Sequence, residues 1–231
     1  MELNSDPLYN TQMEPIEWAK FVVRTRSERD YSTAFSILST SANKGSVDAE
    51  FCLGLLYARG QGVNRDFVTA RYWFQRAAEK GNMSAYYFLG KIYAKGYGIE
   101  KNVNKAVEFF TPPAEHGDAR AQYSLALLYF DGDVIGKDVA EAAKWFEMSA
   151  RSGHSEAQFV LGQLYKTGCG VTKDMNKATD WLISAALNRH KGAQILLGNM
   201  YNTGDGVPKN KIESDNWYDM ADNRNKVTSN Q

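Results

Sequence analysis

The sequence predicts an all-α solenoid of five 36-residue helix-turn-helix repeats preceded by an N-terminal helix pair, because three columns of residues recur in one register. The first column is a leucine, at Leu53, Leu89, Leu125, Leu161 and Leu197. The second is a glycine, at Gly60, Gly96, Gly132, Gly168 and Gly204. The third is aromatic, at Trp73, Phe109, Trp145, Trp181 and Trp217. Such columns indicate a repeat array, in which each repeat buries its apolar face against its neighbours.

The residues before the first full copy are expected to form an arm and a cap. Residues 1–14 show no apolar periodicity, so we expect a disordered arm. Residues 15–45 are expected to form two helices, the first opening at Pro15 and the second ending at Gly45. The first of these helices lacks the repeated leucine, as an end repeat with one face toward water would.

The first full copy sets the pattern for the rest. Apolar residues at steps of three and four predict a helix over 48–59, which Gly60 ends in a left-handed conformation. Asp66 is expected to cap a second helix that runs to about Lys80 and carries Trp73 on its buried side. The same pattern divides the chain into repeats at 46–81, 82–117, 118–153, 154–189 and 190–221, followed by a tail at 222–231 that should fray.

Three copies depart from this pattern. Pro112 and Pro113 fall inside the second helix of the second copy, which should be kinked or broken because proline removes a donor and clashes with the preceding turn. In the third copy the loop 132–135 lacks its second glycine. In the fourth, Arg189 stands where the first copy has a glycine, so the helix end is expected to drift toward Gly192.

Composition narrows the class of partner. The 231 residues carry 27 basic and 27 acidic side chains, so the net charge is zero and the chain lacks the long-range attraction typical of nucleic-acid binders. No window approaches the roughly 18 apolar residues of a membrane span, and the N-terminus does not resemble a secretory signal. Cys52 and Cys169 lie three copies apart, so no disulfide is expected. We expect a cytoplasmic monomer with a protein or peptide partner and no membrane insertion.

The residues that could carry chemistry favour structural roles. The Gly-x-Gly pairs follow helices and recur, whereas a phosphate loop follows a strand. His154 and His190 occupy equivalent turns of neighbouring repeats, too far apart to share a metal ion. Cys169 has no base adjacent in sequence, and Asp131 and Asp133 lie in a turn. The sequence therefore predicts no catalytic residue, no metal ligand and no cofactor, and enzyme activity is not expected.

The first helix of each repeat offers the candidate binding surface. Three positions on it point away from the core leucine, at 100° per residue. Across the copies they read first Phe51, Tyr87, Tyr123, Phe159 and Ile195, then Leu55, Lys91, Leu127, Gln163 and Asn199, then Ala58, Ala94, Phe130, Lys166 and Asn202. The last two columns vary freely, as a binding surface would, and the aromatic column could form a groove for a peptide or a helix. Those rings could instead pack between adjacent first helices. The partner-binding residues selected here are Phe51, Tyr87, Lys91, Tyr123, Leu127, Phe130, Phe159, Gln163 and Lys166.

These residues resemble the Sel-1-like repeat, a relative of the tetratricopeptide repeat, over about residues 30–221. The first copy matches directly at Ala49, Leu53, Gly54, Tyr57, Gly60, Gly62, Val63, Asp66, Ala70, Trp73, Phe74, Ala77, Ala78 and Gly81. The resemblance implies a right-handed superhelix of paired antiparallel helices, with the first helices lining its concave face. It also implies a non-catalytic adaptor or scaffold.

The same resemblance leaves two other roles open. Some bacterial members look like immunity or effector partners of secreted proteins. A cysteine-rich branch is linked with β-lactam binding or hydrolysis, which makes a hydrolase the alternative. That branch carries a disulfide in every repeat, and this chain, with two cysteines, lacks that pattern.

Overall fold

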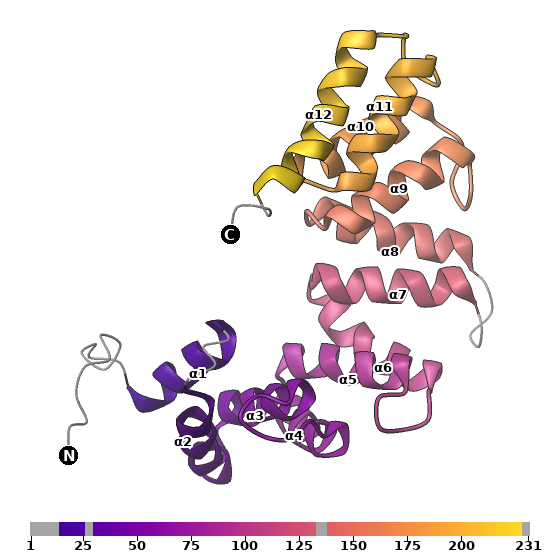
Figure 1. The fold of residues 1–231 in the computed structure, drawn as a ribbon. Helices are drawn as coiled ribbons and strands as arrows, with labels where there is room; N and C mark the ends of the chain where they lie inside the picture. Colours follow the sequence, from indigo (N-terminus) through magenta and orange to yellow (C-terminus); the bar gives the residue numbers. More distant parts are fainter. Residues whose placement is uncertain (1–13, 26–29, 133–137, 228–231) are drawn as a thin grey trace. The chain divides into compact units, whose positions relative to one another are not determined.

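The computed structural model describes residues 14–25, 30–132 and 138–227, so the predicted arm and the last residues of the predicted tail lie outside the described residues. Within these ranges the chain forms twelve helices and no strand, which confirms the all-α fold class (Figure 1). The helices are α1 Pro15–Thr25, α2 Tyr31–Asn43, α3 Val47–Arg59, α4 Phe67–Glu79, α5 Met83–Lys95, α6 Val103–Glu115, α7 Ala119–Asp131, α8 Val139–Arg151, α9 Ser155–Thr167, α10 Met175–Leu187, α11 Lys191–Thr203 and α12 Lys211–Val227.

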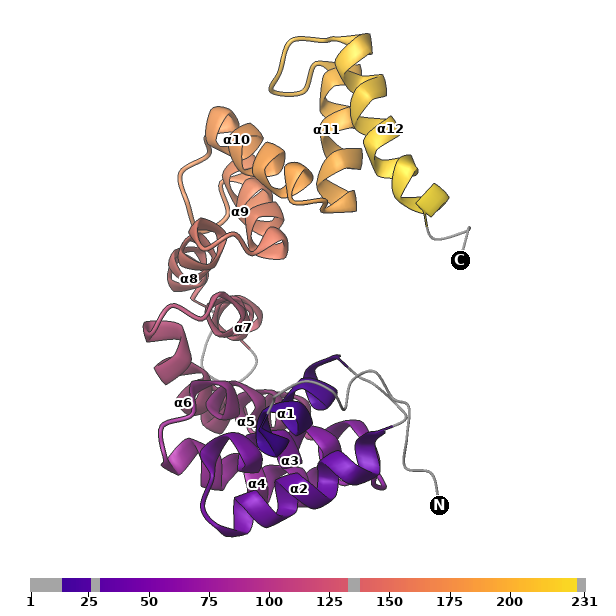
Figure 2. The ribbon, with the colours of Figure 1, turned by 90° about the vertical axis from the view of Figure 1, so that its left-hand side faces the viewer.

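The chain divides into two compact units, an N-terminal unit over residues 1–106 and a C-terminal unit over 107–231, with the boundary inside α6. In each unit, helices that follow one another in sequence pack together: α3 lies beside α4, and α7 beside α8 (Figures 1 and 2). Each full repeat contributes a first helix (α3, α5, α7, α9, α11) and a second helix (α4, α6, α8, α10, α12).

Polar caps and left-handed glycines set the ends of the first helices. Each begins at a side chain that accepts a hydrogen bond from a backbone N–H in the first turn; these caps are Ser46, Asn82, Asp118, His154 and His190. Each ends at a glycine with positive φ, at Gly60, Gly96, Gly132, Gly168 and Gly204, as predicted. The predicted cap on α4 is also present, since the Asp66 carboxylate accepts from the N–H of Val68 at 2.8 Å.

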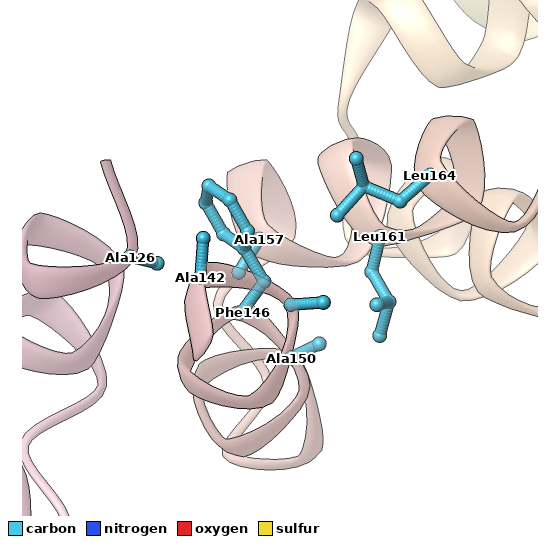
Figure 3. Close-up of a cluster of buried hydrophobic side chains, with 8 residues drawn as sticks. Ala126, Ala142, Phe146, Ala150, Ala157, Leu161 and Leu164 are labelled. Atoms are coloured by element: carbon cyan, nitrogen blue, oxygen red, sulfur yellow. The ribbon is translucent and has the colours of Figure 1, made fainter. Parts of the chain in front are cut away.

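The centre of the core holds the residue after the repeated tryptophan. In the C-terminal unit Phe146 on α8 is fully buried, whereas Trp145 packs at the margin of the same cluster and is partly buried. Figure 3 shows this cluster, with Phe146 on α8 and Leu161 on α9. The N-terminal unit repeats the arrangement: Phe74 is fully buried and Trp73 is not. The sequence predicts Trp73 and Phe74 together on the buried side, which is confirmed for Phe74 and only partly right for Trp73.

A glycine follows the core leucine in four of the five copies, and the third copy has Ala126 there. A Cβ atom on Gly54 would lie 2.5 Å from the ring of Phe74. A Cβ on Gly162 would lie 2.8 Å from Leu182, and one on Gly198 would lie 2.7 Å from the Tyr218 ring. In these three copies the packing of one helix of the repeat on the other requires glycine, whereas the third copy accommodates the fully buried methyl group of Ala126.

Two local predictions differ from the structure. The sequence predicts a kinked or broken helix at Pro112 and Pro113, and the break is wrong, because α6 continues through both prolines to Glu115. The prolines lie in the C-terminal half of α6, so the two missing N–H donors affect only that half. Helix α10 does not drift either. It ends at Leu187, in register with the other second helices, because Arg189 adopts the left-handed conformation itself, with φ of 64°.

The last helix is longer than expected. The sequence predicts a repeat that ends at 221 and a fraying tail, but α12 extends to Val227. Ser214 helps to hold its start, because its buried hydroxyl donates a 2.9 Å hydrogen bond to the Gly198 carbonyl on α11. Residues 228–231 lie outside the described part of the chain.

Candidate functional site

In the N-terminal unit, three predicted binding residues lie on α3 and α5. Phe51 is partly buried, with its ring centroid 5.8 Å from those of both Phe74 and Phe88. Tyr87 is partly buried and meets Phe88 edge-on at 5.5 Å. Lys91 is exposed, and its ammonium lies 5.8 Å from the centroid of the Tyr87 ring. Phe51 therefore contributes to packing, whereas Lys91 holds a cation at the surface against an aromatic support.

In the C-terminal unit, the aromatic column packs on the histidine caps of the following repeats. The Tyr123 ring stacks on His154 with centroids 4.7 Å apart, and its edge meets Phe146 at 5.7 Å. The Phe159 ring stacks on His190 at 4.3 Å. Both aromatic residues stay partly buried, so each presents part of its ring to solvent.

The remaining predicted residues of this unit differ in exposure. Leu127 and Phe130 are partly buried against the cluster around Phe146. Gln163 is exposed on α9. The ammonium of Lys166 pairs with the Asp205 carboxylate at 2.5 Å, so a partner would have to compete with an ion pair inside the unit.

The histidines act as neutral helix caps. Nδ1 of His154 accepts from the Ala157 N–H at 3.3 Å, and Nδ1 of His190 accepts from that of Ala193 at 3.0 Å. Nε2 of His190 lies 2.8 Å from the Glu156 carboxylate, which suits a proton on Nε2. Burial lowers the pKa of His154, which further favours the neutral ring. Among the described residues no group of three potential ligands could hold a metal ion.

The sequence interpretation missed a column of buried polar side chains. Gln122, Gln158 and Gln194 each follow an alanine of the repeat at the 36-residue step, and each is at least 95% buried. Their side-chain N–H groups donate to carbonyls eight residues earlier, at the end of the preceding second helix, over 2.9, 3.1 and 3.0 Å respectively. The 36-residue spacing of these glutamines could have revealed the column from the sequence. Their hydrogen bonds connect each first helix to the second helix of the preceding repeat.

The equivalent position in the first copy is an acid. Glu50 is fully buried, and one of its oxygens accepts from both Arg76 and Lys80 at 2.8 Å. A carboxylate cannot donate to a carbonyl as glutamine does, and two cations stand against it instead, Arg76 on α4 and Lys80 at the C-cap of α4. Removing either cation would leave part of a buried charge uncompensated, which is costly.

The cysteines form no disulfide, as predicted, since both are free thiols. Cys52 is buried, and burial raises the pKa of its thiol to about 11. A thiol with that pKa is almost entirely protonated near neutral pH and is a weak nucleophile. None of the described helices combines the length and the apolar character that crossing a membrane requires.

Comparison with known proteins identifies the repeat. A model of the Sel1 repeat matches five stretches of the chain, at residues 47–82, 84–118, 119–154, 155–190 and 192–221. A Sel1 repeat protein from Oxalobacter formigenes is 32% identical with a TM-score of 0.82, and the match covers 90% of this chain and 86% of that one. No curated protein matches.

Two further structures are similar. The first is c5321, a protective antigen present in uropathogenic Escherichia coli strains and displaying an SLR fold. It is 28% identical with a TM-score of 0.84, and the match covers 91% of this chain but only 45% of the longer antigen. The immunity protein Pa5087 from Pseudomonas aeruginosa shares the fold, at 17% identity and a TM-score of 0.57, over 91% of this chain and 83% of that one. The hydrolase alternative has no support in these matches.

Proposed function

This chain belongs to the Sel1 repeat family, whose members are generally non-catalytic interaction modules, and we propose that it binds a partner protein or peptide through its first helices. The proposal covers one surface in each unit. The N-terminal surface comprises Phe51, Tyr87 and Lys91. The C-terminal surface comprises Tyr123, Leu127, Phe130, Phe159, Gln163 and Lys166.

The observation that carries the proposal is the contrast between neighbouring positions of the same helices. Positions that pack inside the repeat hardly change from copy to copy, as with the fully buried Leu53, Leu89 and Leu161. The position two residues after that leucine changes its chemistry from copy to copy, from the buried Leu55 to the exposed Lys91 and Gln163. Constant packing beneath a variable polar surface beside partly buried rings suits recognition of one partner rather than a repeated catalytic function.

Two roles fit this module. It could be an adaptor in a multiprotein complex, or a bacterial immunity or effector partner. The similarity in fold to the immunity protein Pa5087 supports the second, although that similarity concerns the fold alone. We propose a cytoplasmic, monomeric protein in either case.

The test uses charge changes at exposed first-helix positions. Lys91→Glu and Gln163→Arg, separately and together, would be compared with the wild type in affinity capture from a lysate of the source organism. The matched control is Lys105→Glu, because Lys105 also holds an ammonium over a ring, 5.3 Å from the centroid of Tyr93, but lies on a second helix. All variants would first be shown to melt like the wild type.

The proposal expects a protein captured by the wild type and by Lys105→Glu, and lost or strongly reduced with the double variant. Capture that is the same with all five proteins would overturn the first-helix assignment. So would an equal loss with Lys105→Glu, because binding would then depend on charge in general rather than on these surfaces.

A further inference from the structure

A cavity of about 310 Å³ opens on the side of the second helices in the C-terminal unit, away from the surfaces proposed above. Helix α8 lines it with Glu147 and Arg151, the last turns of α9 with Tyr165, and α10 with Lys177, Asp180 and Trp181. Its volume lies at the lower end of the roughly 300–1,000 Å³ of ligand sites, so it has room for a large side chain of a partner.

One pair of charges in the lining is already satisfied. Nε and Nη2 of Arg151 donate to the same Glu147 oxygen, at 3.1 and 2.7 Å. This pair joins residues one turn apart on α8 and gives the wall of the cavity no net charge. The Glu147–Arg151 pair is therefore a polar but neutral part of the lining, and neither side chain is available to pair with a charged group of a bound molecule.

The two charges on α10 are not paired. The ammonium of Lys177 lies 5.3 Å from the centroid of the Tyr165 ring. Lys177 and Asp180 are three residues apart, which sets their Cβ atoms about 5–6 Å apart on a helix, yet no ion pair joins them. In the described part of the chain the Asp180 carboxylate has neither an ion pair nor a side-chain hydrogen bond.

This arrangement selects against guests of a single charge. Because Glu147 and Arg151 neutralise each other, the open charges are Lys177 and Asp180, and a guest with a single charge can pair with only one of them while the other repels it. A purely apolar guest would desolvate the charges on α10 without pairing them, which is unfavourable. A guest that carries a positive and a negative group can pair with both charges, and the partly buried indole of Trp181, on the same helix, offers an apolar contact beside them.

We propose that this cavity binds a helix of a protein partner that carries an acidic and a basic side chain one turn apart, with an apolar side chain between them. The acidic group pairs with Lys177, the basic group with Asp180, and the apolar side chain enters against Trp181. One-turn spacing on the partner matches the three-residue spacing on α10. This contact lies on the second helices and is separate from the first-helix function.

The probes are four N-acetylated, alanine-based helical peptides that differ in two positions four residues apart on either side of a leucine. The pairs are Glu with Lys, Glu with Glu, Lys with Lys, and Gln with Gln. Binding to the full chain would be followed by the indole N–H signal of Trp181 in a proton–nitrogen correlation spectrum, assigned through Trp181→Phe. The Glu–Lys peptide is expected to bind about tenfold more tightly than the other three, since it alone can form two surface ion pairs.

Two variants change the preference in opposite directions. Lys177→Glu leaves an acidic cavity and should favour the Lys–Lys peptide, whereas Asp180→Lys leaves a basic one and should favour the Glu–Glu peptide. Lys105→Glu removes the same type of lysine–tyrosine contact on α6 and should leave the wild-type order unchanged.

Equal affinity of the wild type for all four peptides would overturn the proposal, and so would a Trp181 signal that none of them moves. A change of preference in Lys105→Glu would also overturn it. None of these outcomes bears on the first-helix surfaces, because the signal reports on the cavity alone.

Discussion

Replacing Arg189 by glycine should stabilise the protein, although it removes a side chain. Arg189 has φ of 64°, whereas the equivalent glycines of the preceding copies, Gly45, Gly81, Gly117 and Gly153, have φ between 85° and 91°. The left-handed conformation destabilises the folded state by roughly 1–2 kcal/mol for a residue that has a Cβ atom. Glycine removes that strain but adds about 0.4–1 kcal/mol of conformational entropy to the unfolded chain. The net expectation is a gain of about 0.5–1 kcal/mol.

Little else changes at this site. The Arg189 side chain is exposed, and the structure assigns it no hydrogen bond or ion pair within the described residues. The converse substitution in the preceding repeat is equally isolated, because a Cβ on Gly153 would meet no atom within 4 Å. Gly153→Ala should therefore cost about 1 kcal/mol through backbone conformation alone.

The assay is urea unfolding followed by circular dichroism. The free energies of unfolding of Arg189→Gly, Arg189→Ala and Gly153→Ala would be compared with that of the wild type, with one common slope of free energy against urea concentration for all proteins. Arg189→Ala keeps the Cβ atom and should stay within about 0.5 kcal/mol of the wild type. The reasoning fails if Arg189→Gly is neutral or destabilising while Gly153→Ala is destabilising, because strain at the two equivalent positions would then not be the same quantity.

Three other substitutions test the packing, the polar column and the histidine caps. Phe146→Ala should cost about 3–5 kcal/mol in urea unfolding, and the adjacent Trp145→Ala clearly less, because only Phe146 is fully buried; equal losses would contradict the assignment of the core. Ser152→Asn should add about 0.5–1.5 kcal/mol in the same assay, because Gln122 Oε1 is buried without a partner, whereas an asparagine at the equivalent place in the next repeat donates to Gln158 at 2.9 Å. No gain would mean that water already satisfies this oxygen. Burial lowers the pKa of His154, so the unfolded chain takes up this proton first and stability falls as the pH drops through the ordinary histidine pKa near 6.5 toward the lowered value. His154→Asn keeps a capping acceptor and should flatten the melting temperature measured across that window; an unchanged pH profile would assign the dependence to other groups.

The repeated columns were enough to predict the helices, because each column constrains a backbone event. The recurring glycine marks where a left-handed residue ends the first helix, and all five glycines do so. The recurring leucine marks the buried face, and Leu53 and its equivalents are almost completely buried. Sequence periodicity was less informative where two adjacent residues both recur at the 36-residue step. Trp145 and Phe146 are only 100° apart on α8, and recurrence alone does not say which one faces the core.

Other differences arise where tertiary context outweighs a local preference. Because helices commonly end at a glycine, the sequence predicts that α10 runs past Arg189 toward Gly192. The helix instead ends at Leu187, and Arg189 adopts a strained left-handed conformation. The candidate surface shows the same limitation. The sequence leaves open whether Tyr123 and Phe159 form a groove or pack between adjacent first helices, and in the structure His154 and His190 of the following repeats cover one side of each ring. Such contacts between repeats are not visible in the periodicity of one helix.

The most direct test of the first-helix binding proposal is photo-crosslinking from one exposed position on each side of the C-terminal unit. A benzophenone amino acid would replace Gln163 on α9 or, as the control, Asn216 on the second helix α12, which does not line the cavity described above; both side chains are exposed. The two labelled proteins would be irradiated in a lysate of the source organism, and the adducts identified by mass spectrometry. The proposal expects one partner protein crosslinked from position 163 and absent from position 216. A partner crosslinked from position 216 and not from 163 would contradict it and move the binding surface to the second helices.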